Sequence, residues 1–151
     1  MVFKYNLQFL MVMICVMNRG YELKEVTVKS NAKNNGHYVP GVISRVMLYV
    51  SGQLPVDHEL GRMVTGDIAE QTRTALANVE RVLEAAGTTK ERVVLCRVYI
   101  PDMADWDTVN QVYREFFGSH KPARVVVPTR ELHHGALVEI EAVAEMPEGT
   151  V

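Results

Sequence analysis

Apolar positions recur with two different periods along the chain, and the two periods together predict an α+β fold. Between residues 67 and 86 they recur every three or four positions, which predicts a helix with one apolar face. The same spacing predicts a second helix over residues 105–117, and a glycine follows each helix. Shorter alternating or β-branched segments are typical of strands. The predicted strands cover residues 23–28, 44–52, 92–100, 123–130 and 136–146.

The predicted elements follow one another in the order β-β-α-β-α-β-β, with a hairpin-like loop over residues 53–63. Because each helix has a single apolar face, we expect both helices on one face of a mixed sheet. Side chains alternate along a strand, so the apolar strand residues cannot all face the helices. The residues concerned are Val93, Leu95, Tyr99, Val126 and Val138. An uncovered apolar sheet face usually packs on a partner chain, and we therefore expect a homo-oligomer.

The composition is typical of an ordinary globular domain and narrows the function. The 151 residues are 48% hydrophobic and 23% charged, which suits one sizeable core. The net charge of −2 and the absence of a cluster of lysine and arginine argue against nucleic acid as a partner. The two cysteines, Cys15 and Cys96, are too few for a disulfide framework and favour a reducing, cytoplasmic location. Cys96 falls in an apolar run, which predicts a buried thiol.

The beginning of the chain differs from the rest in its pattern. Residues 1–21 are interpreted as an N-terminal extension, and residues 22–151 as a single domain. The apolar run from Phe9 to Val16 is too short to span a bilayer, so we expect no membrane partner. No small-x-small cleavage site follows this run, which disfavours a signal peptide, and Met17 is interpreted as the native start.

Six segments, in a fixed order, carry a resemblance to a known family. They are GHYVPGV (36–42), YVSGQLPVD (49–57), EQTRTALANVERVLEAAG (70–87), VYIPDMADWDTVNQVYREFF (98–117), PAR (122–124) and GALVEIEAVA (135–144). The chain from about residue 22 to residue 146 resembles the Rid proteins, also called YjgF-like, which are named for deamination of reactive enamine and imine intermediates. The resemblance implies a chorismate mutase-like fold, assembled as a homotrimeric barrel with active sites in the clefts between subunits. It also implies hydrolysis of 2-imino acids to 2-oxo acids and ammonia, and we predict no cofactor.

Arg124 stands at the start of a valine-rich strand, where a charged residue leads directly into buried sheet. One interpretation is a strand-end arginine that reaches water along its own methylenes. The other is an anion-binding fork, because a guanidinium gives a planar carboxylate two parallel hydrogen bonds where lysine gives a point charge. The resemblance matches Arg124 to the carboxylate-binding arginine of the family. It also implies that the backbone N–H near Val126 contributes to the same site.

Glu139 matches the water-positioning carboxylate of the family. A carboxylate at this position could orient a water against the iminium carbon, or accept its proton as a general base. The alternative is that Glu139 and Glu141 both point to solvent from an alternating edge strand, and for Glu141 this stays open. Tyr38, Ser51 and Asn110 match further pocket positions. An isolated aromatic is more often simple packing, and a mid-helix asparagine is more often an exposed or capping amide.

Two positions depart from the family pattern and leave the substrate range open. Val126 stands where relatives close to the best-known deaminases often carry cysteine. His133 and His134 follow Leu132, where a leucine-proline pair is usual. Adjacent residues on an extended chain point apart, so this histidine pair is not expected to bind a metal, and we predict no metal site.

Three functions stay open on the sequence. Arg124 and Glu139 together favour a hydrolase like 2-iminobutanoate/2-iminopropanoate deaminases, acting on a small 2-imino acid in metabolite damage control. A non-catalytic regulatory trimer that binds a small carboxylate could keep both residues. An endoribonuclease or translation inhibitor is disfavoured, because the sequence has no basic patch with interleaved aromatic residues.

Overall fold

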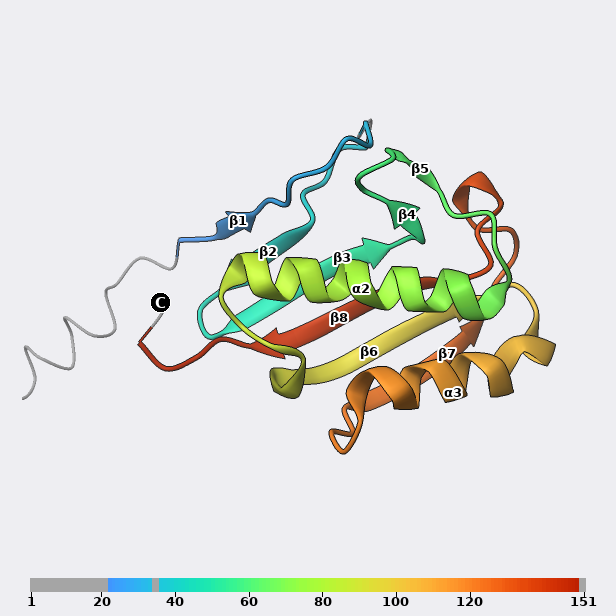
Figure 1. Ribbon diagram of the computed structural model, residues 1–151. Coiled ribbons are helices and arrows are strands. Elements are labelled where there is room, and N and C mark those ends of the chain that lie inside the picture. Colours follow the sequence, from blue (N-terminus) through green and yellow to red (C-terminus); the bar gives the residue numbers. More distant parts are fainter. Residues whose placement is uncertain (1–21, 34–35, 150–151) are drawn as a thin grey trace, which may run out of the picture.

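Residues 22–33 and 36–149 are described by the computed structural model, and they build one main sheet with two helices packed on one face (Figure 1). The strands are β1 (Lys24–Val26), β2 (Gly41–Ser44), β3 (Met47–Gln53), β4 (Val56–Asp57), β5 (Arg62–Met63), β6 (Val93–Ile100), β7 (Ala123–Pro128) and β8 (Glu139–Glu145). The helices are α2 (Ile68–Ala86) and α3 (Trp106–Phe117). Neither of these two helices has the length and apolarity that a bilayer crossing requires, in the part of the chain described. The interpretations of residues 1–21 and of Met17 lie outside the described residues.

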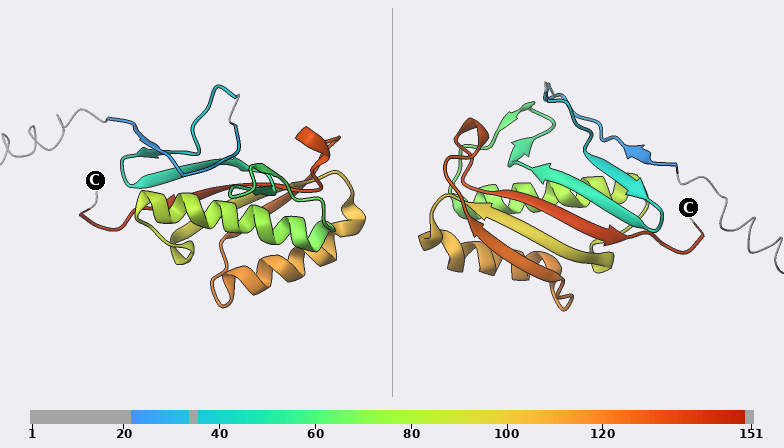
Figure 2. Two further views of the ribbon diagram at one scale, coloured as in Figure 1. Left: turned by 45° about the horizontal axis from the view of Figure 1, so that its top comes forward. Right: turned by 180° about the vertical axis from the view of Figure 1, so that it is seen from behind.

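The main sheet is mixed, with the strand order β1-β2-β3-β8-β6-β7. All neighbouring strands are antiparallel except β6 and β7, which pair in parallel. A parallel pair needs a long crossover connection, and α3 supplies it. As a result β7 is an edge strand that lies next to α3, while β8 sits in the middle of the sheet. Both helices cover the same face, and no helix of residues 22–33 and 36–149 lies on the opposite face (Figure 2).

The helix α2 forms where the apolar spacing predicted it, and its ends follow ordinary capping rules. The Asp67 carboxylate accepts a hydrogen bond of 2.9 Å from the backbone N–H of Glu70, which satisfies a free donor of the first turn. Gly87 ends the helix with a φ of 83°, a conformation that favours glycine. The buried face of α2 packs on the sheet through Ala75, Leu76, Val79, Val82 and Leu83. This contact builds the main core and makes α2 a rigid support for the loops above it.

The α+β class and the mixed sheet with two helices on one face are as the sequence predicts, but the strands before α2 differ. The predicted strand over residues 44–52 corresponds to β3, which begins only at Met47, after a tight turn at Arg45. The strand β2 before this turn was not predicted. Arg45 has a φ of 56°, which non-glycine residues adopt rarely. The segment reads as continuous sheet because neither glycine nor asparagine marks the turn. The hairpin-like loop contains a small two-stranded ladder, β4 with β5.

The sheet face without helices is mixed in character rather than uniformly apolar. Val93 and Val138 are buried with the core, and Val126 packs against the core as well. Leu95 and Tyr99 belong to the other face, as strand alternation requires. That face also carries Arg97, which forms an ion pair of 3.0 Å with Glu141 of β8. The expectation of an uncovered apolar face is therefore correct only in part, because this face combines apolar side chains with an ion pair.

Candidate active site

The residues that the sequence singles out fall into two groups on opposite faces of the sheet. The first group lies between β7 and α3, and we call it the arginine half-site: Arg124, Asn110 and Val126. The second group lies where β3 ends and β8 begins, and we call it the glutamate half-site: Tyr38, Ser51 and Glu139. Arg124 pairs with Cys96, whose side chain is in the core, whereas Glu139 pairs with Tyr99 on the face without helices. Within one chain the two half-sites therefore do not meet.

In the arginine half-site, Arg124 leans from the edge strand β7 onto α3. Its Nη2 donates a hydrogen bond of 3.0 Å to Oδ1 of Asn110. Its guanidinium carbon lies 4.6 Å from the ring centroid of Tyr113 and 5.7 Å from that of Trp106. Asn110 is thus neither a solvent-facing nor a capping amide, because it accepts a hydrogen bond from the cation. Val126 follows on the same side of β7 and is partly buried against the core.

The charge of Arg124 is held entirely by neutral groups. The ion pairs found in residues 22–33 and 36–149 are Lys90–Glu80 and Arg97–Glu141, so no carboxylate of this part of the chain neutralises Arg124. Burial is the main cause that raises the pKa of the Cys96 thiol to about 11. Burial and the neighbouring Cys96 also raise the pKa of Tyr113, so both groups stay uncharged at neutral pH. A guanidinium supported in this way keeps most of its N–H donors available for an anion.

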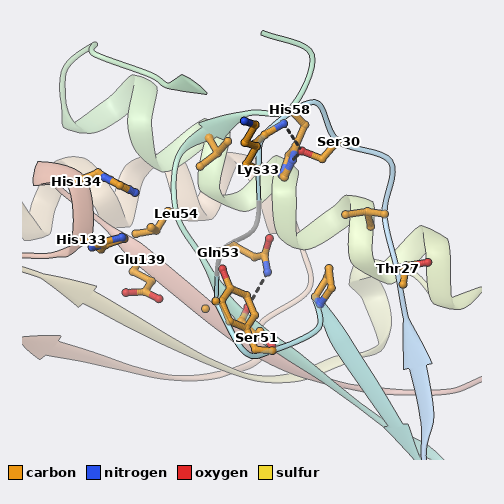
Figure 3. A pocket seen from close by; sticks show the side chains of 17 residues that line it. Thr27, Ser30, Lys33, Ser51, Gln53, Leu54, His58, His133, His134 and Glu139 are labelled. Atoms are coloured by element: carbon orange, nitrogen blue, oxygen red, sulfur yellow. Dashed lines mark hydrogen bonds between the residues drawn. The ribbon is translucent and has the colours of Figure 1, made fainter. Parts of the chain in front are cut away.

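The glutamate half-site is a pocket of about 790 Å³. It lies between the loop that precedes β2, the ends of β3 and β8, and the hairpin β4–β5 (Figure 3). Tyr38 lines it with 59% of its surface exposed. The Ser51 hydroxyl donates to the carbonyl oxygen of Val39 at 2.7 Å, which fastens the loop carrying Tyr38 to β3. Ser51 therefore shapes the wall of the pocket, and its hydroxyl proton is already engaged.

A local irregularity of the sheet places the Glu139 side chain. The register between β3 and β8 shifts between Val50 and Gln53, and Gly52 lies inside this bulge. A Cβ at Gly52 would overlap the Glu139 carboxylate, so only glycine leaves the space that the carboxylate occupies. Bulges often re-aim a side chain next to a functional site. The β3–β8 bulge therefore sets where Glu139 points.

Two polar side chains of α2 hold the backbone segments that border this pocket. The Gln71 side-chain oxygen accepts a hydrogen bond of 2.9 Å from the backbone N–H of Leu137, just before β8. Asn78 donates to the carbonyl oxygens of Leu54 and Val56, both at 2.9 Å. Gln71 and Asn78 are both buried, so these hydrogen bonds are costly to lose. The helix thus holds both the entry to β8 and the strand end that follows Gly52.

The two glutamates of β8 have different surroundings on the same sheet face. Glu139 is half-buried, and burial first and the charge of Glu141 second raise the pKa of its carboxyl, while His133 opposes this shift. Glu141 accepts hydrogen bonds from Arg97 at 3.0 Å and from the Tyr99 hydroxyl at 2.7 Å. Glu141 therefore lies on the face without helices, where it is paired with Arg97 and Tyr99. The edge strand assumed for both glutamates is wrong, because β8 is a central strand of the sheet. Glu139 is the carboxylate that faces the pocket.

His133 and His134 line the same pocket, and Figure 3 shows them beside Glu139. The expectation that their side chains point apart is wrong, because their ring centroids lie 3.8 Å from each other. The chain is a 3₁₀ turn at this point, and His134 has a φ of 60°, so the extended geometry assumed for it does not apply. Within the described ranges, no group of three or more His, Cys, Asp or Glu side chains has the arrangement of a metal site.

Three residues that contact the two half-sites are not identified by sequence reasoning. Gly52 reads as a strand terminator, although it lies inside β3 and makes room for Glu139. In the sequence, Tyr113 belongs to the apolar face of a predicted helix, and Trp106 belongs to the first turn of that helix. The signal available for them is their helical spacing from Asn110, which places all three on the side of α3 that can meet β7.

Comparison with solved structures identifies the fold. Escherichia coli TdcF, solved with bound serine, matches with a TM-score of 0.77 and 33% identity over 82% of this chain and 99% of that chain. YyfA of Yersinia pestis, described as a conserved Rid family protein, matches with a TM-score of 0.79 and 35% identity over 83% of this chain and all (100%) of that one. The architecture is therefore that of the small α+β proteins of the YjgF and L-PSP type.

The sequence comparisons agree with this class. The model of the family described as Endoribonuclease L-PSP matches residues 28–146, and the chain belongs to this family, which includes the Rid or YjgF-like proteins. A RutC family protein of Pyrococcus horikoshii is 43% identical over 123 residues, which are 81% of this chain and 98% of that protein. The human 2-iminobutanoate/2-iminopropanoate deaminase is 38% identical over 109 residues, which are 72% of this chain and 80% of that enzyme.

Proposed function

We propose that this protein hydrolyses small 2-imino acids to 2-oxo acids and ammonia in clefts between the subunits of a homotrimer. The observation that carries the proposal is the division of the site. Arg124 is a cation without a carboxylate partner in the described ranges, and Glu139 is a half-buried carboxylate, but they lie on opposite sheet faces. A substrate that contacts both side chains therefore needs the arginine half-site of one chain and the glutamate half-site of another.

The surface of the chain supports such an assembly. On the sheet face without helices, Tyr49 lies opposite Val143 and Val143 lies opposite Leu95, which forms a row of apolar side chains across three strands. Tyr49 is 51% exposed, and Val125 of the neighbouring edge strand is 44% exposed. Large exposed apolar side chains that gather on one face usually mark a contact with another protein. A second and third copy of this chain is the occupant that also completes the divided site.

The chemistry needs few protein groups. Arg124 holds the substrate carboxylate with paired hydrogen bonds, and so fixes the neighbouring C=N carbon. Glu139 orients a water molecule and accepts one of its protons as the water oxygen bonds to that carbon. The proton passes from Glu139 to the substrate nitrogen, and the C–N bond breaks with its electron pair going to the departing ammonia. As the C=O bond forms, Glu139 accepts the hydroxyl proton and passes it to the ammonia, which leaves as ammonium. The products are a 2-oxo acid and ammonium, so the atoms of the protonated imine and of water are all accounted for.

The surroundings of Glu139 suit this role. Burial raises the pKa of its carboxyl, which makes the ionised form a better proton acceptor than an exposed glutamate. The protonated imine is already electron-poor, so a weak base that is well placed is sufficient. Tyr38 and the histidine pair form the part of the pocket that the side chain of the substrate would meet. The names of the deaminase relatives are in accord with this chemistry.

Co-expression of two inactive variants tests the proposal. Arg124→Ala and Glu139→Gln chains should each be inactive alone, whereas mixed trimers should release ammonia from 2-iminopropanoate generated in the assay. Each cleft takes one residue from each of two neighbours, so random mixing in a cyclic trimer restores about one quarter of the clefts. Sedimentation checks that the mixture is trimeric.

The matched control is co-expression of Arg124→Ala with a chain that carries both substitutions, because no cleft of that mixture contains an arginine. Activity should stay absent there. If mixed trimers of the two single variants were also inactive, the shared cleft would be wrong. If the wild-type chain bound 2-oxobutanoate but released no ammonia from 2-iminopropanoate, a carboxylate-binding regulatory role would replace the hydrolase.

A further inference from the structure

We propose that Trp106 and Tyr113 are positioning residues for Arg124, and that their rings hold the guanidinium in the orientation in which its free N–H groups meet the substrate carboxylate. The inference rests on the proposed function, because it assumes that Arg124 binds that carboxylate. It concerns residues of α3 that would not touch the substrate themselves.

The three contacts of Arg124 come from one face of α3. Trp106, Asn110 and Tyr113 are separated by four and then three residues, which is the spacing of side chains that lie along one side of a helix. The parallel pairing of β6 with β7 brings Arg124 next to this side of the helix. One helix face therefore presents two rings and one amide oxygen to the same cation.

The two rings differ in their surroundings. Tyr113 is 7% exposed, and its ring centroid lies 4.6 Å from that of Phe117, with the two rings tilted against each other. Trp106 is 37% exposed and stands at the first turn of α3. The guanidinium carbon of Arg124 lies 4.6 Å from the first ring and 5.7 Å from the second, both within the range of a cation–π contact. Arg124 thus has one fixed inner support and one outer support that borders solvent.

Support by aromatic rings has a specific chemical advantage for an anion-binding arginine. A carboxylate partner would neutralise the charge and occupy the donors that a ligand needs. A ring attracts the cation through its π face and uses none of the in-plane N–H groups. Asn110 uses one donor of Nη2, and fixes the rotation of the plane. The side chain is therefore ordered before the ligand arrives, which lowers the entropy lost on binding.

The first experiment separates positioning from folding by measuring KM and kcat for 2-iminopropanoate hydrolysis. Trp106→Leu should raise KM about two- to fivefold, and Tyr113→Leu up to about thirtyfold, with much smaller changes in kcat. Trp106→Phe and Tyr113→Phe keep a ring in place and should restore KM close to that of the wild type. A merely structural role would lower the melting temperature and the folded fraction, but would leave KM unchanged.

The second measurement uses fluorescence, because Trp106 is the single tryptophan of the chain. Titration of the wild-type protein with 2-oxobutanoate, the product carboxylate, should change the tryptophan emission in a saturable way. The midpoint should agree with the inhibition constant of 2-oxobutanoate in the hydrolysis assay. Arg124→Lys should abolish the change, because the ligand then no longer orders a group beside the ring.

The outcomes distinguish the inference from the function on which it rests. If Trp106→Leu and Tyr113→Leu keep the wild-type KM while Arg124→Lys loses activity, positioning by the rings is wrong and the proposed function stands. If Arg124→Lys keeps full activity, the carboxylate-binding role fails, and the inference fails with it. Tyr113→Leu removes a buried ring and could unfold the chain. In that case Trp106→Leu at the surface decides, because an unchanged KM there overturns the role of Trp106 directly.

Discussion

The two half-sites of one chain are built by opposite means. The arginine half-site holds a full charge on neutral supports, namely two rings and an amide, at the edge of the sheet. The glutamate half-site holds a carboxylate at the start of the central strand β8, beside a second carboxylate and against a glycine that leaves it room. The first arrangement orders a side chain and keeps its donors free. The second arrangement raises the proton affinity of a side chain.

The two environments suit the two different roles that we propose for these side chains. A carboxylate-binding group gains from being rigid and permanently charged, and Arg124 has both properties. A group that accepts a proton gains from an environment that shifts its pKa, and Glu139 has this property. Because the two environments lie on different sheet faces, each can be altered without disturbing the other.

Arg124→Lys should lower kcat/KM by about thirtyfold to several-thousandfold, nearly as much as Arg124→Ala. One ammonium cannot reproduce the paired hydrogen bonds of the guanidinium, and loss of such a desolvated contact is on the order of 2–5 kcal/mol. Stability should change little, because the remaining contacts of Arg124 are with neutral groups. Steady-state imine hydrolysis and thermal melts on the same preparations give both values. A destabilised but fully active Arg124→Ala would show a structural strand-end arginine instead.

Gly52→Ala should lower kcat by about a hundredfold, because a misplacement of about 1 Å at a reacting group has an effect of that size. The new Cβ would meet the end of the Glu139 side chain, which is flexible and can move away. The melting temperature should therefore stay close to that of the wild type. Hydrolysis kinetics with a thermal melt would measure both.

Gly41→Ala is the matched control in the same sheet. Its Cβ would lie 2.9 Å from Val82 in the core, so this variant should lose stability but keep its activity per folded molecule. If Gly52→Ala behaved like Gly41→Ala, the bulge would be a packing feature and would not place the carboxylate.

Glu139→Gln should raise the melting temperature slightly at neutral pH while it removes activity. The pKa of Glu139 is raised in the folded protein, so the folded chain binds this proton more tightly than the unfolded chain. The wild type therefore loses stability as the pH rises through the interval between the ordinary value of 4.5 and the higher folded pKa. Thermal melts between acidic and neutral pH should show that the difference in melting temperature between the variant and the wild type shrinks as the pH falls toward 4.5.

Glu141→Gln is the control for this prediction, because Glu141 accepts hydrogen bonds from Arg97 and Tyr99. Loss of that charge should lower the melting temperature at neutral pH, opposite to the effect at Glu139. Equal and unfavourable shifts in both variants would contradict the raised pKa of Glu139.

Much of the fold could be predicted from the sequence, because it follows from local pattern. The apolar face of α2 and its caps at Asp67 and Gly87 define that helix within one residue. The valine-rich segments give β6 and β7 nearly to their ends. The turn at Arg45 could not be predicted, because its positive φ is imposed by the pairing of β2 with β3 and no residue type announces it.

The sequence picks out the residues of the candidate site, but it does not give their arrangement in space. The resemblance identifies Arg124 and Glu139 as candidates. Their separation of fifteen residues does not tell on which face of the sheet each side chain lies. The face depends on the parallel register of β7 with β6 and the antiparallel register of β8 with β6, which are tertiary facts. The roles of Gly52 and Tyr113 depend on contacts between distant segments. Pattern alone assigns such residues to a strand end and to a helix core.

The position of β7 at the edge of the sheet also bears on how this protein avoids uncontrolled association. An edge strand offers unpaired backbone groups on which further strands can add, and this is a common route to aggregation. Pro122 precedes β7 and Pro128 closes it, and a proline has no N–H to offer a neighbouring strand. The strand that presents Arg124 is thus bounded at both ends by residues that stop sheet growth. A short, interrupted edge of this kind admits a partner of defined geometry and discourages an open-ended stack.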